Sequence, residues 1–90
     1  MYFYSIYHQE TNIMEKKVFI EKFREALEIN SLTLDENTPL KSIDGYDSMS
    51  VMATIALVDE LFSKRLTAKQ LAEVSTIKNL MELIGTDNFS

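Results

Sequence analysis

Apolar residues recur at helical spacing in three stretches of this chain. Between residues 15 and 28 they follow i, i+1, i+4, i+7 and i+8, and between 75 and 85 they follow i, i+3, i+4 and i+7. Both patterns are typical of a helix with one buried side. The third stretch, 48–63, has apolar residues on two sides. The residues of the first and last patterns are Phe19, Ile20, Phe23, Ala26 and Leu27, and Ile77, Leu80, Met81 and Ile84.

A shorter helix is predicted at 67–72, where Thr67 stands three residues before Gln70 as in a capping box. Strong helix formers dominate the rest of the chain, and its 90 residues include only two glycines and one proline. These features predict an all-α fold, a small four-helix bundle with room for a single core.

The two apolar sides of the stretch 48–63 have different neighbours. The side expected to face the core consists of Val51, Ile55, Val58 and Phe62. The second side consists of Met49, Met52, Ala53 and Ala56. A central helix buried nearly all round would explain both sides. We favour a docking face for partner proteins, because Asp59 and Glu60 flank the second side and because methionine side chains adapt to varied surfaces.

The connection from 30 to 47 is long, and Pro39 and Gly45 interrupt it. Loops of this length in compact domains are often functional or well anchored. Four apolar residues recur along it, so we expect an ordered loop pinned to the core. These residues are Leu32, Leu34, Leu40 and Ile43.

The two ends of the chain are predicted to lie outside the fold. Residues 1–13 show no helical or strand period and lack the features of a signal peptide. They are interpreted as a tail, or as a segment upstream of a native start at Met14. Residues 14–85 then form the folded domain, and 86–90 form a frayed C-terminal tail.

The net charge of −5 is concentrated in one part of the sequence. Residues 35–60 hold six acids and one base, whereas the other residues hold eight of each. A concentrated acidic surface repels nucleic acid and anionic membranes and favours basic protein partners. No apolar run has membrane-spanning length, so we expect a cytoplasmic protein without membrane insertion.

Ser48 is the residue with the strongest chemical signal. It follows Gly45 and Asp47 at the start of a predicted helix, where free backbone N–H groups and the helix dipole favour a phosphate. Catalysis by this serine would need a base. The chain has no cysteine, and its one histidine is His8 in the predicted tail. We therefore expect no catalytic residue and no metal site, since Asp44 and Asp47 alone supply too few ligands.

Two roles remain for this Asp-Ser pair: attachment of a group to Ser48 by another protein, or simple N-capping of a helix. The wider pattern favours the first role, because the stretch from Glu15 to Ile84 resembles the acyl carrier protein family. Asp47-Ser48-Met49 resembles the Asp-Ser-Leu of that family, with methionine in place of leucine. The other matching positions are Leu40, Gly45, Val51, Ile55, Val58, Asp59, Glu60, Phe62, Thr76 and Ile77.

The resemblance implies a bundle of acyl-carrier type, with a long first loop and a short third helix. It implies that a phosphopantetheinyl transferase, recognising the flanking Asp47, attaches 4'-phosphopantetheine from coenzyme A to Ser48. An acyl- or aminoacyl-loading ligase and downstream acyl-transferring or synthase enzymes would then use the thioester on the arm, with an acyl chain sheltered in the core. The implied protein is a non-catalytic monomer. Its expected partner-binding residues are Asp44, Met49, Met52, Ala53, Ala56, Asp59 and Glu60.

Departures from the family pattern suggest a specialised carrier. Ser50 and Ala53 occupy positions where many fatty-acid carriers have acids, and Lys64 and Arg65 follow Phe62 closely. These differences favour an amino acid, a hydroxy acid or an unusual acyl group as cargo. The alternative is a carrier-like helical interaction module that never holds the arm.

Overall fold

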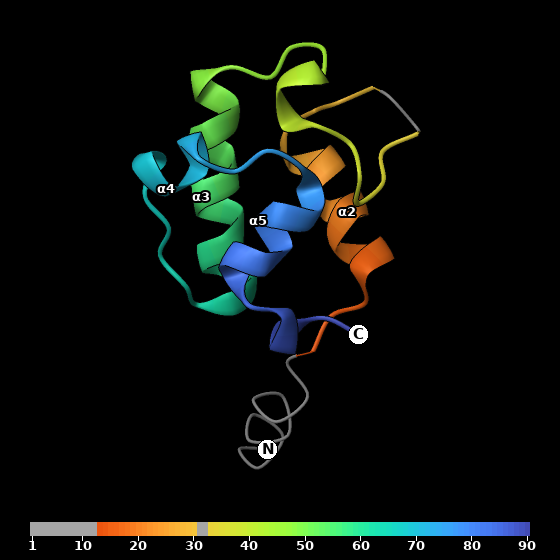
Figure 1. The fold of residues 1–90 in the computed structure, drawn as a ribbon, viewed down its shortest axis with the longest axis vertical. Coiled ribbons are helices and arrows are strands. Elements are labelled where there is room, and N and C mark those ends of the chain that lie inside the picture. Colours follow the sequence, from red (N-terminus) through yellow and green to blue (C-terminus); the bar gives the residue numbers. More distant parts are fainter. Residues whose placement is uncertain (1–12, 31–32) are drawn as a thin grey trace.

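The computed structural model describes residues 13–30 and 33–90, and the regular structure within them is helical (Figure 1). Four α-helices and two short 3-10 turns follow one another along the chain. They are α2 (Lys16–Ala26), η1 (Leu40–Ser42), α3 (Ser48–Phe62), α4 (Ala68–Ala72), α5 (Ile77–Ile84) and η2 (Thr86–Asn88). The predicted all-α bundle, with its long first connection and short third helix, is confirmed.

The core lies between α2, α3 and α5 (Figure 1). Phe19 and Phe23 of α2 are fully buried, as the spacing predicted, but Ala26, the last residue of α2, is exposed. All four predicted apolar residues of α5 are buried, and α4 adds its buried Leu71. Capping boxes start α4 at Thr67, as the sequence predicted, and α5 at Thr76.

The described part of the long connection is anchored to α5 by the backbone. The Leu40 N–H donates to the Ser75 carbonyl at 2.8 Å, and the Ile77 N–H donates to the Thr38 carbonyl at 3.2 Å. Leu40 and Ile43 are buried, and Leu34 packs partly against the core. The predicted anchoring therefore holds for these residues. Leu32 lies outside the described residues.

The buried side of α3 differs from the predicted stripe. Val58 is fully buried, but Val51, Ile55 and Phe62 only pack partly against the core. The buried residues of this helix are Ser50, Thr54, Leu57 and Val58. A buried hydroxyl is tolerated when it has a partner, and the Thr54 hydroxyl donates to the Ser50 carbonyl at 2.8 Å.

The C-terminal segment closes the core, so the prediction of a frayed end at 86–90 is wrong. The Met14 N–H donates to the Asn88 carbonyl at 2.9 Å, and the Ser90 N–H donates to the Met14 carbonyl at 3.1 Å. Phe89 is buried, and its ring packs edge-on against Phe19 at 5.3 Å and Phe62 at 5.2 Å. Residues 1–12 of the predicted N-terminal tail lie outside the described residues.

Candidate functional site

Asp47 is the N-cap of α3. The chain reaches it through a turn in which the Tyr46 N–H donates to the Ile43 carbonyl at 3.1 Å and Gly45 adopts a φ of 84°. A glycine suits this turn because L-residues rarely adopt such a φ. One carboxylate oxygen of Asp47 then accepts the N–H groups of Met49 and Ser50, both at 3.1 Å. The predicted capping role therefore belongs to Asp47.

Ser48 is the first residue of α3, and its side chain is exposed. Within the part of the chain that the structure describes, its hydroxyl makes no hydrogen bond. The hydroxyl is thus accessible to another protein, at the end of the helix where the dipole favours an added negative charge. The local structure fits a phosphodiester on Ser48.

The backbone donors expected to hold that phosphate are mostly engaged. Of the N–H groups that the start of α3 leaves without an intrahelical partner, those of Met49 and Ser50 donate to the Asp47 carboxylate. The Asp47 N–H donates to the Ser50 hydroxyl at 3.2 Å. The Ser48 N–H is the one left, so a phosphate at Ser48 would gain the dipole and one donor, beside a carboxylate of like charge.

Six of the seven predicted docking residues are exposed, rather than buried in the bundle. Met49 is 77% exposed and Met52 is 64% exposed. Asp44, Ala56, Asp59 and Glu60 are also exposed, and Ala53 is half-buried. They do not form one compact cluster around Ser48, since Asp59 lies eleven residues along α3, about 16 Å at 1.5 Å per residue. Met49 and Met52, one and four residues after Ser48, are the large apolar side chains of α3 that are exposed.

Tyr46 supports the turn before Ser48. Its ring packs partly against the core, and this burial raises the pKa of its phenol above the ordinary value of 10.0.

Within 13–30 and 33–90, no group of three or more His, Asp or Glu side chains is placed to hold a metal ion. No helix of the described residues is long and apolar enough to span a membrane.

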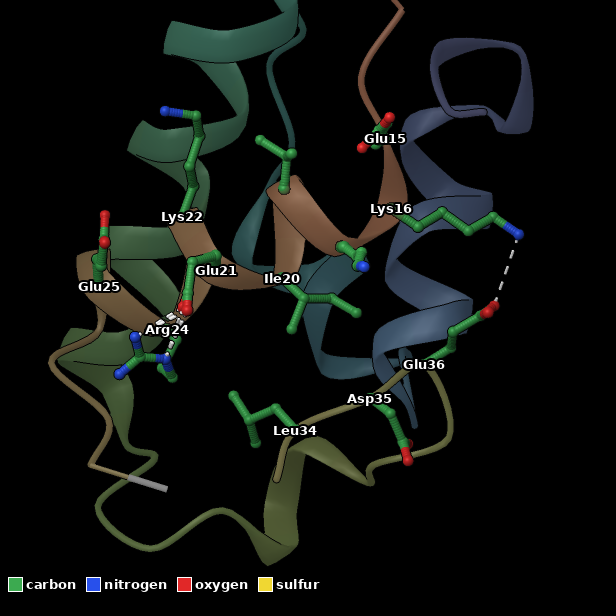
Figure 2. Close-up of a pocket in the computed structure, with 12 residues that line it drawn as sticks. Glu15, Lys16, Ile20, Glu21, Lys22, Arg24, Glu25, Leu34, Asp35 and Glu36 are labelled. Carbon is green, nitrogen blue, oxygen red and sulfur yellow. Dashed lines mark hydrogen bonds and ion pairs between the residues drawn. The ribbon is translucent and has the colours of Figure 1, made fainter. Parts of the chain in front are cut away.

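A groove of about 820 Å³ lies on the outer side of α2 and does not include the Ser48 end (Figure 2). Its apolar lining residues are Val18, Ile20 and Leu34, and its other lining residues are charged. Arg24 donates to both carboxylate oxygens of Glu21, at 2.7 and 2.8 Å, and this contact lowers the pKa of Glu21. This groove offers no shelter next to Ser48, and the predicted acyl shelter stays a prediction.

Sequence reasoning missed the role of Ser50. It treated this serine as a missing acid, whereas Ser50 is the N3 residue of the capping box, 7% exposed and bonded to Asp47. The spacing Asp47-x-x-Ser50 is the signal that would have found it. Lys64, another departure from the family pattern, donates from Nζ to the Ile84 carbonyl at 3.0 Å and so caps the end of α5.

Comparison with family models covers the region that contains this site. The family model for the phosphopantetheine attachment site matches residues 17–84, which contain α2's core phenylalanines, Ser48 and α5. The chain belongs to this family. Comparison with curated proteins and with solved structures gave no significant match.

Membership determines the cofactor and the general class of this carrier domain. The group that the family binds is 4'-phosphopantetheine. Carrier domains of this family are generally non-catalytic and interact with transferases and synthase enzymes. The phosphopantetheine carrier domain described here has one exposed serine at the start of a helix, preceded by a capping aspartate, in the matched region.

Proposed function

We propose that this domain holds acyl or aminoacyl groups as thioesters on a 4'-phosphopantetheine arm attached to Ser48, in a specialised biosynthetic pathway. The observation that carries the proposal is the exposed, unbonded Ser48 hydroxyl at the start of α3, within a chain of the phosphopantetheine attachment site family. The arm supplies the thiol that the cysteine-free polypeptide lacks.

The attachment step is a phosphoryl transfer by a partner transferase. The Ser48 Oγ forms a bond to the phosphorus that carries the pantetheine of coenzyme A, and the bond to the adenosine bisphosphate breaks. The serine proton goes to a base of the transferase, because the described residues contain no histidine or cysteine. What this chain contributes is the position of its hydroxyl, outside the capped first turn of α3.

The partner surface in this proposal is the exposed side of α3 with its acidic surroundings. Residues 35–60 hold six acids and one base, which favours transferases, ligases and synthases with basic docking surfaces. Asp47 has a capping role in the free protein, and recognition by the transferase would use whatever part of its carboxylate stays accessible. The proposed docking residues are Asp44, Met49, Met52, Ala53, Ala56, Asp59 and Glu60.

The specialised role rests on the charge of α3. Within this helix the acids are Asp59 and Glu60, both near its C-terminal end, and its first turn carries none. Enzymes that dock on acids at the positions of Ser50 and Ala53 would find a serine and an alanine here instead. We therefore propose a narrow set of partners and a cargo such as an amino acid, a hydroxy acid or an unusual acyl group.

The test is modification of the full chain by a broad phosphopantetheinyl transferase with coenzyme A. Intact-mass measurement should show addition of one arm, and Ser48→Ala should abolish the addition while leaving the thermal unfolding midpoint unchanged. Ser63→Ala, a serine beyond the other end of α3, is the control and should still accept the arm. Absence of any mass shift with several transferases would contradict the proposal.

The exposed Met49 and Met52 support a second candidate, an interaction module that never carries the arm. In that case partner binding would be unaffected by Ser48→Ala and weakened by Met52→Glu. Ser48→Ala distinguishes the candidates, because it should abolish transfer of cargo by a carrier and should leave the function of an interaction module intact.

A further inference from the structure

The hydroxyl of Ser50 joins the turn before Ser48 to the first turn of α3. It accepts the Asp47 N–H at 3.2 Å. Its own proton faces two acceptors, the Gly45 carbonyl at 3.4 Å and the Asp47 carboxylate at 3.3 Å. Ser50 is 7% exposed, so its side of these part-buried contacts is covered by the protein. One small side chain thus contacts both ends of the turn 45–47.

These contacts also hold the Asp47 carboxylate in place. The same oxygen accepts the Met49 N–H, the Ser50 N–H and a contact from the Ser50 hydroxyl, at 3.1, 3.1 and 3.3 Å. The carboxylate is therefore directed along the helix backbone, with Ser48 between the two residues of the capping box. Gly45 has a φ of 84° and no side chain that could restrain the turn. The Ser50 hydroxyl therefore adds a side-chain restraint to the backbone bond between Tyr46 and Ile43.

We propose that Ser50 is a positioning residue for the modification of Ser48: its buried hydroxyl fixes the turn 45–47 and the Asp47 carboxylate, and thereby the place of the Ser48 hydroxyl. The proposal rests on the proposed function of Ser48. Removing the hydroxyl leaves the Asp47 N–H without its partner, and loosens the turn beside the reacting oxygen. The docking residues Met49 and Met52 keep their exposed positions, so the transferase should still bind.

The experiment compares Ser50→Ala, Ser50→Thr and Gln70→Ala in the full chain. Gln70 is the matched control, because it is the N3 residue of the capping box of α4 and its side chain accepts the Thr67 N–H at 2.9 Å. We expect Ser50→Ala to lower kcat for arm attachment about fivefold, the factor for about 1 kcal/mol, with KM for the carrier changed less than twofold. Ser50→Thr retains a hydroxyl and should recover most of kcat, and Gln70→Ala should leave kcat unchanged.

A second readout needs no transferase. Amide hydrogen exchange at residues 47–50 should accelerate in Ser50→Ala and stay unchanged in Gln70→Ala. Unchanged kcat and exchange in Ser50→Ala would overturn the positioning role, and so would an equal loss of kcat in Gln70→Ala, which would indicate a general loss of stability. If the wild-type chain accepts no arm at all, the proposed function fails first and the positioning role fails with it.

Discussion

The two ends of α3 are built differently. At its start, Ser48, Met49 and the capping Asp47 are exposed, and local hydrogen bonds hold the first turn. At its end, Phe62 packs against Phe19 and Phe89, with ring centroids 6.0 and 5.2 Å away. One helix therefore has an end whose order comes from short-range polar contacts and an end whose order comes from aromatic packing between distant segments.

Because of this difference, we expect the proposed modification of Ser48 and the stability of the fold to depend on different ends of α3. Each local contact at the start of α3 is worth about 1 kcal/mol, whereas one buried aromatic ring is worth several times more. A change at the Ser48 end should therefore alter modification or binding with a small loss of stability. A change at the Phe62 end should do the reverse.

The largest effect on stability is expected at the Phe62 end. Phe89→Ala should lower the free energy of unfolding by about 3 kcal/mol, because it removes a buried ring that contacts Phe19 and Phe62. Urea denaturation measures this loss, and Phe89→Leu, which keeps much of the apolar volume, should lose less than half as much. At temperatures where Phe89→Ala is folded, arm attachment to Ser48 should proceed at the wild-type rate. A clearly lower rate in the folded variant would contradict the independence of the two ends of α3.

The next effect is expected in partner binding. Met52→Glu should weaken binding of the apo chain to a phosphopantetheinyl transferase about tenfold, because a carboxylate must lose water to enter an apolar contact. Isothermal titration calorimetry measures the dissociation constant, and Met52→Leu is the matched control that keeps an apolar side chain. The free energy of unfolding should stay within about 0.5 kcal/mol of the wild type, since Met52 is 64% exposed. Equal affinities of the glutamate and leucine variants would place the docking surface elsewhere.

A smaller loss of stability is expected from the cap itself. Asp47→Ala should lower the free energy of unfolding by about 1 kcal/mol, because the Met49 and Ser50 N–H groups lose their acceptor. Asp47→Ser replaces one capping side chain with another and should retain most of the stability. If arm attachment nonetheless slows in Asp47→Ser, the transferase recognises the carboxylate; a wild-type rate would limit Asp47 to capping.

The smallest effect is expected from Tyr46 at high pH. Burial raises the pKa of its phenol above 10.0, so the folded state holds the proton more tightly than the unfolded state. The resulting stability is fully present below pH 10 and is lost as the pH rises through the higher pKa of the folded protein. The difference between absorbance titrations of wild type and Tyr46→Phe isolates this residue, and a midpoint at or below pH 10 would contradict the burial of its ring.

The sequence predicted most of the bundle because its signals are local. Apolar spacing located α2 and α5, the capping box of Thr67 located the start of α4, and the Gly45-Tyr46-Asp47-Ser48 stretch located the start of α3. The buried side of α3 was partly wrong for a physical reason. Hydrophobic periodicity counts Ser50 and Thr54 as polar, yet their hydroxyls are buried because each bonds to nearby backbone.

The sequence pattern could not predict contacts between residues that lie far apart in the chain. Nothing near Phe89 in the sequence shows that its ring meets Phe19 and Phe62, which lie 70 and 27 residues away. At the candidate site, the Asp-Ser pair directed attention to Ser48. The sequence did not show which nearby N–H groups are already hydrogen-bonded, because that depends on which residue caps the helix. Both Asp47 and Ser48 are common N-caps, and the choice between them became clear only with coordinates.

The pairing of Met14 with Phe89 has a practical consequence for building larger assemblies. The two ends of the described domain meet at the pole where α3 ends (Figure 1), and the fifteen residues of α3 separate that pole from Ser48 by about 22 Å. A tag, linker or fused enzyme joined directly to either end of the described domain would thus depart from the side opposite the serine. Such fusions should leave the proposed arm free to reach its partners, and a short tether could join the two ends of the domain without crossing the proposed docking face.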